Sequence, residues 1–107
     1  MNQLAQRFTY RNKKILAHAK GQACKNCGVM DETVVAAHSN QAKHGKGRGI
    51  KAHDAFVAFL CNRCHSWLDS GTGRDPTNLW EEHEKSLMFN EAMHRTWLVL
   101  LGDGILK

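Results

Sequence analysis

Two short apolar runs divide the middle of the chain. They cover residues 33–37 (TVVAA) and 56–60 (FVAFL) and are rich in β-branched or aromatic side chains. Runs of this length and composition predict buried strands. Each strand would deliver a chemically reactive side chain at its end, because His38 follows the first run and Cys61 follows the second.

Two longer segments have apolar residues at roughly helical spacing. One covers about residues 4–20 and is followed by Gly21, which suits a left-handed helix C-cap. The other is predicted to form a long helix over about residues 76–101, because Asp75 can cap it and Pro76 already has a helical φ. The expected inward stripe of this second helix consists of Leu79, His83, Leu87, His94, Trp97, Leu98 and Leu101.

The segment between the two apolar runs, residues 40–53 (NQAKHGKGRGIKAH), combines glycines with basic residues. Such a composition predicts a loop and excludes a regular element. Two interpretations carry equal weight: a solvated connection, or a cationic loop that follows a phosphate backbone. Under the second interpretation, the nucleic-acid-binding candidates are Lys43, Lys46, Arg48 and Lys51.

The length and charge of the chain favour a single-domain protein that binds a polyanion. A chain of 107 residues is long enough for a single domain, which we expect to cover residues 1–107. The net charge of +5 favours a polyanionic partner, in the first place nucleic acid. We expect a cytoplasmic protein without membrane association, because the N-terminus has no apolar signal segment and no apolar run is long enough to span a bilayer.

The four cysteines form two C-x-x-C pairs, Cys24 with Cys27 and Cys61 with Cys64. In a reducing compartment, cysteines paired in this way indicate a metal more often than disulfides. Gly28 follows the first pair and lets the backbone fold around an ion, as in zinc knuckles. We therefore predict one structural Zn²⁺ on four thiolates, a constraint that suits so short a chain.

A second set of polar residues accompanies the second cysteine pair. If residues 62–70 are helical, His65 and Asp69 share one face of the helix, one turn apart. Cys64 and His65 are neighbours that point in different directions, so the short helix can serve two centres. We expect a sulfur site that holds the fold and a separate imidazole and carboxylate site open to chemistry.

The predicted order of elements is a strand, a loop, a second strand and a helix, with His38 after the first strand and C-x-x-C-H at the start of the helix. This arrangement resembles the HNH nuclease family. Its fold is also called ββα-metal. The similarity covers roughly residues 24–71 and is greatest to the small prophage-encoded, YbcO-type members. It implies an α+β fold with a zinc-stapled ββα-metal core over about residues 22–71, an N-terminal helix and a long C-terminal helix.

The resemblance also implies roles for single residues. His38 matches the general base, which deprotonates a water for in-line attack on a phosphodiester. His65 matches a ligand of the catalytic divalent ion, Mg²⁺ or Mn²⁺, and Asp69 falls where many relatives have a second ligand. Asp54 lies near the middle asparagine of the family pattern and would orient His38 or reach the metal. The sequence departs from the pattern in this aspartate and at Ala37, where many members have a metal-binding Asp or His.

The function implied by the resemblance is a metal-dependent DNA endonuclease, phage or prophage encoded, with a recombination or replication protein as a further partner of unknown identity. Two alternatives stay open: a zinc-stabilised nucleic-acid-binding module without activity, and a protein-interaction adaptor. The nuclease is favoured by the additional histidines and carboxylates, because a zinc module does not need them: His38, Asp54, His65 and Asp69. The basic loop argues against the adaptor. For the nuclease we expect His38, His65 and Asp69 to converge on one surface cleft, apart from the cysteines.

Overall fold

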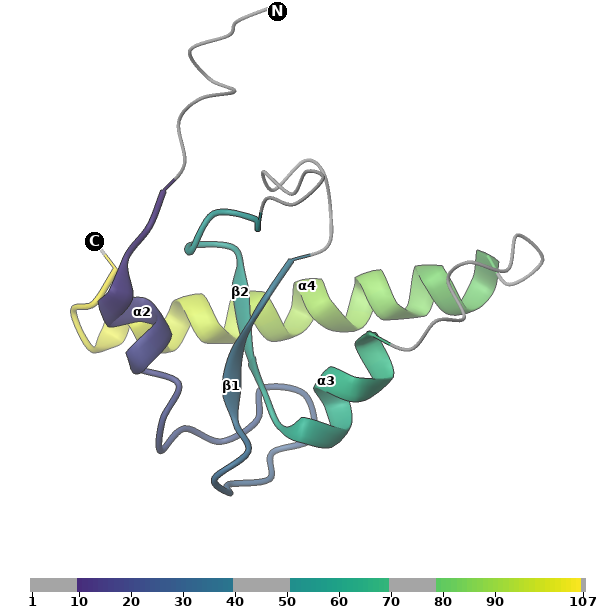
Figure 1. Ribbon diagram of the computed structural model, residues 1–107, viewed down its shortest axis with the longest axis horizontal. Coiled ribbons are helices and arrows are strands. Elements are labelled where there is room, and N and C mark those ends of the chain that lie inside the picture. Colours follow the sequence, from purple (N-terminus) through teal and green to yellow (C-terminus); the bar gives the residue numbers. More distant parts are fainter. Residues whose placement is uncertain (1–9, 40–50, 70–78, 107) are drawn as a thin grey trace, which may run out of the picture.

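The chain forms a two-stranded antiparallel sheet flanked by helices (Figure 1). The computed structural model describes residues 10–39, 51–69 and 79–106. Within these ranges the elements are α2 (Lys13–Ala17), β1 (Val35–His38), β2 (Val57–Leu60), α3 (Asn62–Leu68) and α4 (Leu79–Gly102). The architecture is α+β, and none of the helices in these ranges combines the length and apolar character that crossing a bilayer requires.

The two apolar runs form the sheet, as predicted. β1 pairs with β2 from Val35 opposite Leu60 to His38 opposite Val57. Every residue of β2 is buried, whereas β1 turns Ala37 into the core and leaves His38 partly exposed. Because side chains alternate along a strand, His38 lies on the opposite face of β1 from Ala37.

β2 is hydrogen-bonded on both of its edges. On the edge away from β1, the Phe59 N–H donates to the hydroxyl of Thr96 in α4 (3.0 Å), and the Phe59 carbonyl accepts the N–H of Lys25 (2.8 Å). The Thr96 hydroxyl in turn donates to the Ala92 carbonyl one turn earlier (2.8 Å). A helix and a loop thus satisfy the polar groups of an edge that would otherwise be open.

The apolar core lies between β2 and α4, which crosses behind the sheet (Figure 1). Its largest members are Phe59 from β2, Ile15 from α2, and Phe89 and Leu100 from α4. At the crossing, α4 presents the small residue Ala92, so that the helix backbone approaches the strand closely enough for the Phe59 hydrogen bond.

The inward face of α4 differs from the prediction. Leu87, Leu98 and Leu101 are 53%, 70% and 52% exposed. His83 and His94 are exposed as well, so the predicted inward stripe is wrong at all of these positions. The buried residues of the helix keep the same three- and four-residue spacing on a different face, and include Phe89, Ala92, Met93, Thr96 and Leu100. The face against β2 combines large apolar residues with Ala92 and with Thr96, whose hydroxyl binds the Phe59 N–H, a contact that hydrophobic spacing does not reveal.

The predicted helix over residues 4–20 is wrong in its central part. Asn12 has an extended backbone (φ −147°, ψ 100°), and α2 begins only at Lys13. The Asn12 side chain caps this helix by accepting the N–H of Lys14 (3.0 Å), which satisfies an otherwise unpaired donor of the first turn. Residues 4–9 and 76–78, where the two terminal helices were predicted to begin, lie outside the described residues.

We predict that Thr96→Val destabilises the protein by about 1–3 kcal/mol, because it leaves the buried Phe59 N–H without an acceptor while keeping the side-chain shape. The melting temperature should fall by roughly 4–8 °C for each kcal/mol. Thermal and urea unfolding monitored by circular dichroism would measure the change. Thr96→Ser, which keeps the hydroxyl and loses one methyl group, is the matched control. A Val variant at least as stable as the Ser variant would contradict the importance of this bond.

Candidate metal centre and histidine–carboxylate pairs

The four cysteines gather at the end of the sheet where β2 leads into α3. Cys24 and Cys27 belong to the loop between α2 and β1, and Cys61 and Cys64 lie at the start of α3. Their four sulfur atoms all lie within 4.8 Å of one another. The hydrogen bond from the residue after Cys24 to the Phe59 carbonyl holds the first pair beside the strand that ends in the second.

The first pair lies in a tight turn around Gly28. The Gly28 N–H donates to the Cys24 carbonyl (2.9 Å), and the Cys24 N–H donates to the Val29 carbonyl (2.7 Å). Gly28 has a φ of 84°, a left-handed conformation that costs other residues roughly 1–2 kcal/mol. The second pair needs no such turn, because Cys61 is the extended N-cap residue of α3 and Cys64 lies in its first turn.

The sulfur geometry suits a tetrahedral ion. Cys27 Sγ and Cys61 Sγ are 3.7 Å apart, and all four cysteines are free thiols. Ligands at a Zn–S distance of about 2.3 Å are separated by roughly 3.8 Å along each edge of a tetrahedron. Elsewhere in the described ranges, no group of three or more His, Cys, Asp or Glu residues brings its ligand atoms this close together. The cluster could therefore bind a structural metal ion such as zinc.

The electrostatics of the cluster also suit a cation. Burial opposes ionisation of Cys24, but backbone hydrogen bonds from Cys27, Cys61 and Asn26 together lower its pKa from 9.0 to about 6. Burial and the neighbouring thiols raise the pKa of Cys64 to about 12, although Asn26 Nδ2 donates to its sulfur (3.3 Å). Cys24 therefore forms a thiolate readily, whereas a second negative charge on the neighbouring Cys64 is unfavourable. A divalent cation removes that repulsion.

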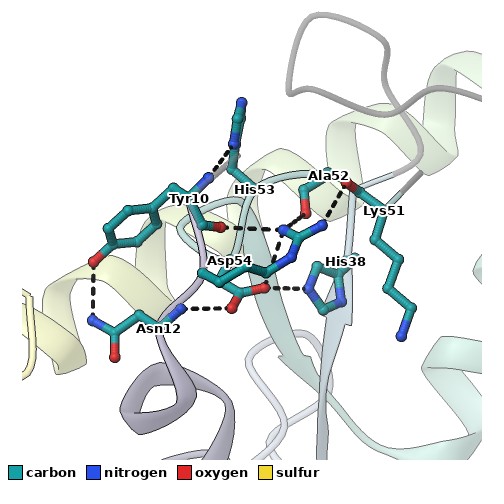
Figure 2. Close-up of polar contacts among 8 residues, drawn as sticks. Tyr10, Asn12, His38, Lys51, Ala52, His53 and Asp54 are labelled. Atoms are coloured by element: carbon teal, nitrogen blue, oxygen red, sulfur yellow. Dashed lines mark hydrogen bonds and ion pairs between the residues drawn. The ribbon is translucent and has the colours of Figure 1, made fainter. Parts of the chain in front are cut away.

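His38, at the end of β1, is hydrogen-bonded to Asp54 in the turn before β2 (Figure 2). Its Nε2 lies 2.8 Å from Asp54 Oδ1. Asp54 is 2% exposed, and its other oxygen accepts the N–H of Asn12 (2.7 Å). A carboxylate among N–H donors accepts from the imidazole as well, which assigns the His38 proton to Nε2 and a lone pair to Nδ1.

The His38 side chain is 18% exposed, and the described residues place no hydrogen-bonding partner on its Nδ1. An imidazole held by a carboxylate on one nitrogen can take a proton on the other, and the carboxylate then stabilises the imidazolium. The pair is therefore chemically able to act as a general base.

The second pair lies on α3. His65 Nε2 is 3.1 Å from Asp69 Oδ2, and the two side chains are 37% and 53% exposed. This is the one-turn relationship expected for a shared helix face. α3 starts at the cysteine end of the sheet and turns back along it (Figure 1). The four candidates thus form two hydrogen-bonded pairs, and the convergence of both pairs on one cleft stays a prediction.

Of the four predicted nucleic-acid-binding residues, Lys51 falls within the described part of the chain. Its side chain is exposed, and its carbonyl accepts a hydrogen bond from the Arg11 guanidinium (3.1 Å). Lys43, Lys46 and Arg48 lie outside the described residues.

Residues 10–12, just before α2, also reach the histidine site, although no sequence motif predicted that they would. The Tyr10 N–H donates to His53 Nδ1 (2.8 Å), and the Asp54 N–H donates to the Tyr10 carbonyl (2.9 Å). No local sequence pattern predicts these contacts, because they join positions more than 40 residues apart. Arg11 lies in the segment, about residues 4–20, for which a helix was predicted.

Comparison with known proteins gives a match to one family. Residues 3–96 match the profile described as "Protein of unknown function (DUF968)". No curated protein and no solved structure shows significant similarity to the chain. The matched region contains both cysteine pairs, both histidine–carboxylate pairs and most of α4. The chain therefore belongs to the DUF968 family.

Proposed function

We propose that the protein is a metal-dependent DNA endonuclease of the HNH type. The observation that carries the proposal is the His38–Asp54 hydrogen bond, which leaves Nδ1 of a partly exposed imidazole able to accept a proton. A zinc module or an interaction adaptor does not require such a pair. The order of two strands and a helix opening with C-x-x-C-H, and the net charge of +5, add support.

In the proposed reaction, His38 removes a proton from water at Nδ1, and the water oxygen attacks the phosphorus atom of the scissile phosphodiester in line with the 3′ oxygen. The bond between phosphorus and the 3′ oxygen breaks, and its electron pair stays on that oxygen, which takes a proton from solvent water. The products therefore carry 5′-phosphate and 3′-hydroxyl ends. Asp54 remains a carboxylate throughout. It fixes the imidazole orientation and stabilises the positive charge that His38 acquires.

His65 and Asp69 would hold the divalent ion, Mg²⁺ or Mn²⁺. Their ligand atoms are 3.1 Å apart. This is close to the separation of roughly 3.0 Å between neighbouring ligands in an octahedron with metal–ligand distances of about 2.1 Å. When bound, the ion would polarise the phosphate and stabilise the leaving oxygen. With two protein ligands it would keep several waters and bind weakly until a DNA phosphate joins.

The four-cysteine cluster would hold one Zn²⁺ with a structural role. A shell of four thiolates is closed and has no position for water or substrate, so the chemistry falls to the other residues. The cluster joins the loop after α2 to the start of α3, and α3 carries His65 and Asp69. Zinc would thus also fix the helix on which the catalytic ion depends.

For zinc, we expect one ion per purified chain, bound more weakly as pH falls. The thiols must lose their protons to bind the ion, and because the pKa of Cys64 is about 12, zinc displaces a proton from this thiol at neutral pH. Elemental analysis and chelator competition between about pH 6 and pH 8 would measure both properties. Cys61→Ser should be poorly folded, whereas Ser66→Ala, on an exposed position of α3, should behave as wild type. Purified protein with two disulfides and no zinc would refute this assignment.

For cleavage, we expect plasmid nicking that requires Mg²⁺ or Mn²⁺ and falls by about 10²–10⁴-fold in His38→Ala, the range typical of a missing general base. Zinc content and folding should be unchanged, because His38 is not a ligand of the cysteine cluster. His65→Ala should lose activity through the metal, and raised Mn²⁺ should partly restore Asp69→Ala. Gel assays and end-labelling of the products would measure these effects.

The matched control for this experiment is His94→Ala, which removes an exposed histidine of α4. It should cleave as wild type does. If wild type and His38→Ala are equally inert on duplex, branched and single-stranded DNA with Mg²⁺, Mn²⁺, Ni²⁺ and Zn²⁺, the protein is a zinc-stabilised binding module and the nuclease proposal fails.

For DNA binding, charge reversal of Lys51 should weaken affinity and reduce the salt dependence, because fewer counterions are released. The slope of log K against log salt should change by about 0.9 for each DNA phosphate that the protein no longer neutralises. Fluorescence anisotropy with a labelled duplex over a range of salt concentrations measures both quantities. Reversal of Lys43, Lys46 and Arg48 together with Lys51 should enlarge the effect. An equally large decrease in affinity in Lys20→Glu, an exposed cation after α2, would show that only overall charge matters.

A further inference from the structure

The guanidinium of Arg11 links the segment before α2 to residues 51–54, beside the histidine site. Its Nη1 donates to the carbonyls of Ala52 (2.8 Å) and Tyr10 (3.1 Å) and lies 3.4 Å from Asp54 Oδ1. Its Nη2 donates to the Lys51 carbonyl (3.1 Å). A planar group with several donors in a fixed fork can make these contacts at once. Arg11 therefore fixes the path of the backbone immediately before the buried carboxylate.

The backbone around Arg11 reinforces this arrangement. Residues 10–12 run beside residues 52–54. The Tyr10 N–H binds the His53 side chain (Figure 2), and the Asp54 N–H binds the Tyr10 carbonyl. The Asn12 N–H binds Asp54 Oδ2, while Arg11 and the imidazole both approach Oδ1. Donors on both oxygens leave the carboxylate a single orientation.

That orientation determines how the imidazole is presented. The hydrogen bond from His38 Nε2 to Asp54 restrains the imidazole ring, and with it the direction of Nδ1. If the carboxylate rotates, or the backbone before it shifts, Nδ1 moves with it. A misplacement of about 1 Å at a reacting atom can lower turnover by roughly 10²-fold.

We propose that Arg11 is a positioning residue for the His38 base, acting through Asp54 and the Lys51–Ala52 backbone. The proposal rests on the nuclease function and deepens it, because it makes the segment before α2 part of the catalytic apparatus. Arg11 touches no reacting atom in this role. Its removal should therefore lower kcat while KM stays close to the wild-type value.

Three variants separate this role from charge and from general stability. Arg11→Ala removes the fork, Arg11→Lys keeps the charge without the fork, and Lys13→Ala removes an exposed cation two residues away as the matched control. We expect kcat to fall by about 10²-fold in both Arg11 variants, and the control to match wild type. Retained activity in Arg11→Lys with a raised KM in Arg11→Ala would indicate direct phosphate binding and overturn the proposal. Unchanged kcat in Arg11→Ala would overturn it as well.

A second measurement does not depend on cleavage. In ¹⁵N NMR of the imidazoles, wild-type His38 should show the Nε2–H tautomer, and Arg11→Ala should shift it toward a mixture of tautomers. The control, Lys13→Ala, should leave the signal unchanged. Zinc content and circular dichroism report whether each variant is folded. If Arg11→Ala does not fold, Arg11→Lys supplies the comparison. If wild type cleaves no DNA but Arg11→Ala still changes the His38 signal, the nuclease function is refuted and the positioning role of Arg11 is kept. An imidazole signal that is identical in wild type and the Arg11 variants would refute the positioning role itself.

Discussion

The hydrogen bonds on the outer edge of Phe59 are the interaction on which the rest of the structure depends. A sheet of two short strands is only marginally stable and leaves backbone groups unpaired on its edges. Here the Phe59 N–H is bound by Thr96 of α4 and the Phe59 carbonyl by Lys25 of the first cysteine loop. One buried residue thus joins the sheet, the long helix and the four-cysteine cluster. β2 continues directly into Cys61 and α3, so the same strand sets the position of the second cysteine pair and of the residues beyond it.

α3 shows how a helix of seven residues can serve two kinds of site. Cys64 is buried and points into the sulfur cluster, whereas the next residue, His65, is partly exposed and pairs with Asp69. Neighbouring positions on a helix are turned by about 100° from each other, which is enough to separate a structural ligand from a chemical group. A bound structural ion would therefore restrict the motion of the exposed pair without taking part in its chemistry.

Features that leave a spacing or composition pattern in the sequence were mostly predicted, whereas contacts that leave no such pattern were not. The two strands and the helix after them follow from apolar runs and short spacings, and the gathering of four thiols follows from two C-x-x-C pairs. The face of α4 was mispredicted because Thr96 faces inward for a hydrogen bond to Phe59, which hydrophobicity does not reveal. The contacts of residues 10–12 with residues 51–54 join segments about 40 positions apart. Only the folded backbone brings the Arg11 side chain to Asp54.

The two departures from the HNH pattern, at Ala37 and Asp54, have a common physical explanation. Ala37 is 1% exposed and pairs with the fully buried Ala58, so an aspartate at this position would place a charge in the core, on the opposite face of β1 from His38. A metal ligand is therefore excluded there, and Asp54 instead supplies a carboxylate on the His38 side of the strand. Because N–H donors already occupy both of its oxygens, Asp54 suits orientation of an imidazole better than coordination of an ion. Under the proposed function, the carboxylate serves the base and α3 alone supplies the protein ligands of the metal. Such a metal site would be weak without DNA, while the base would be set in place before the substrate binds.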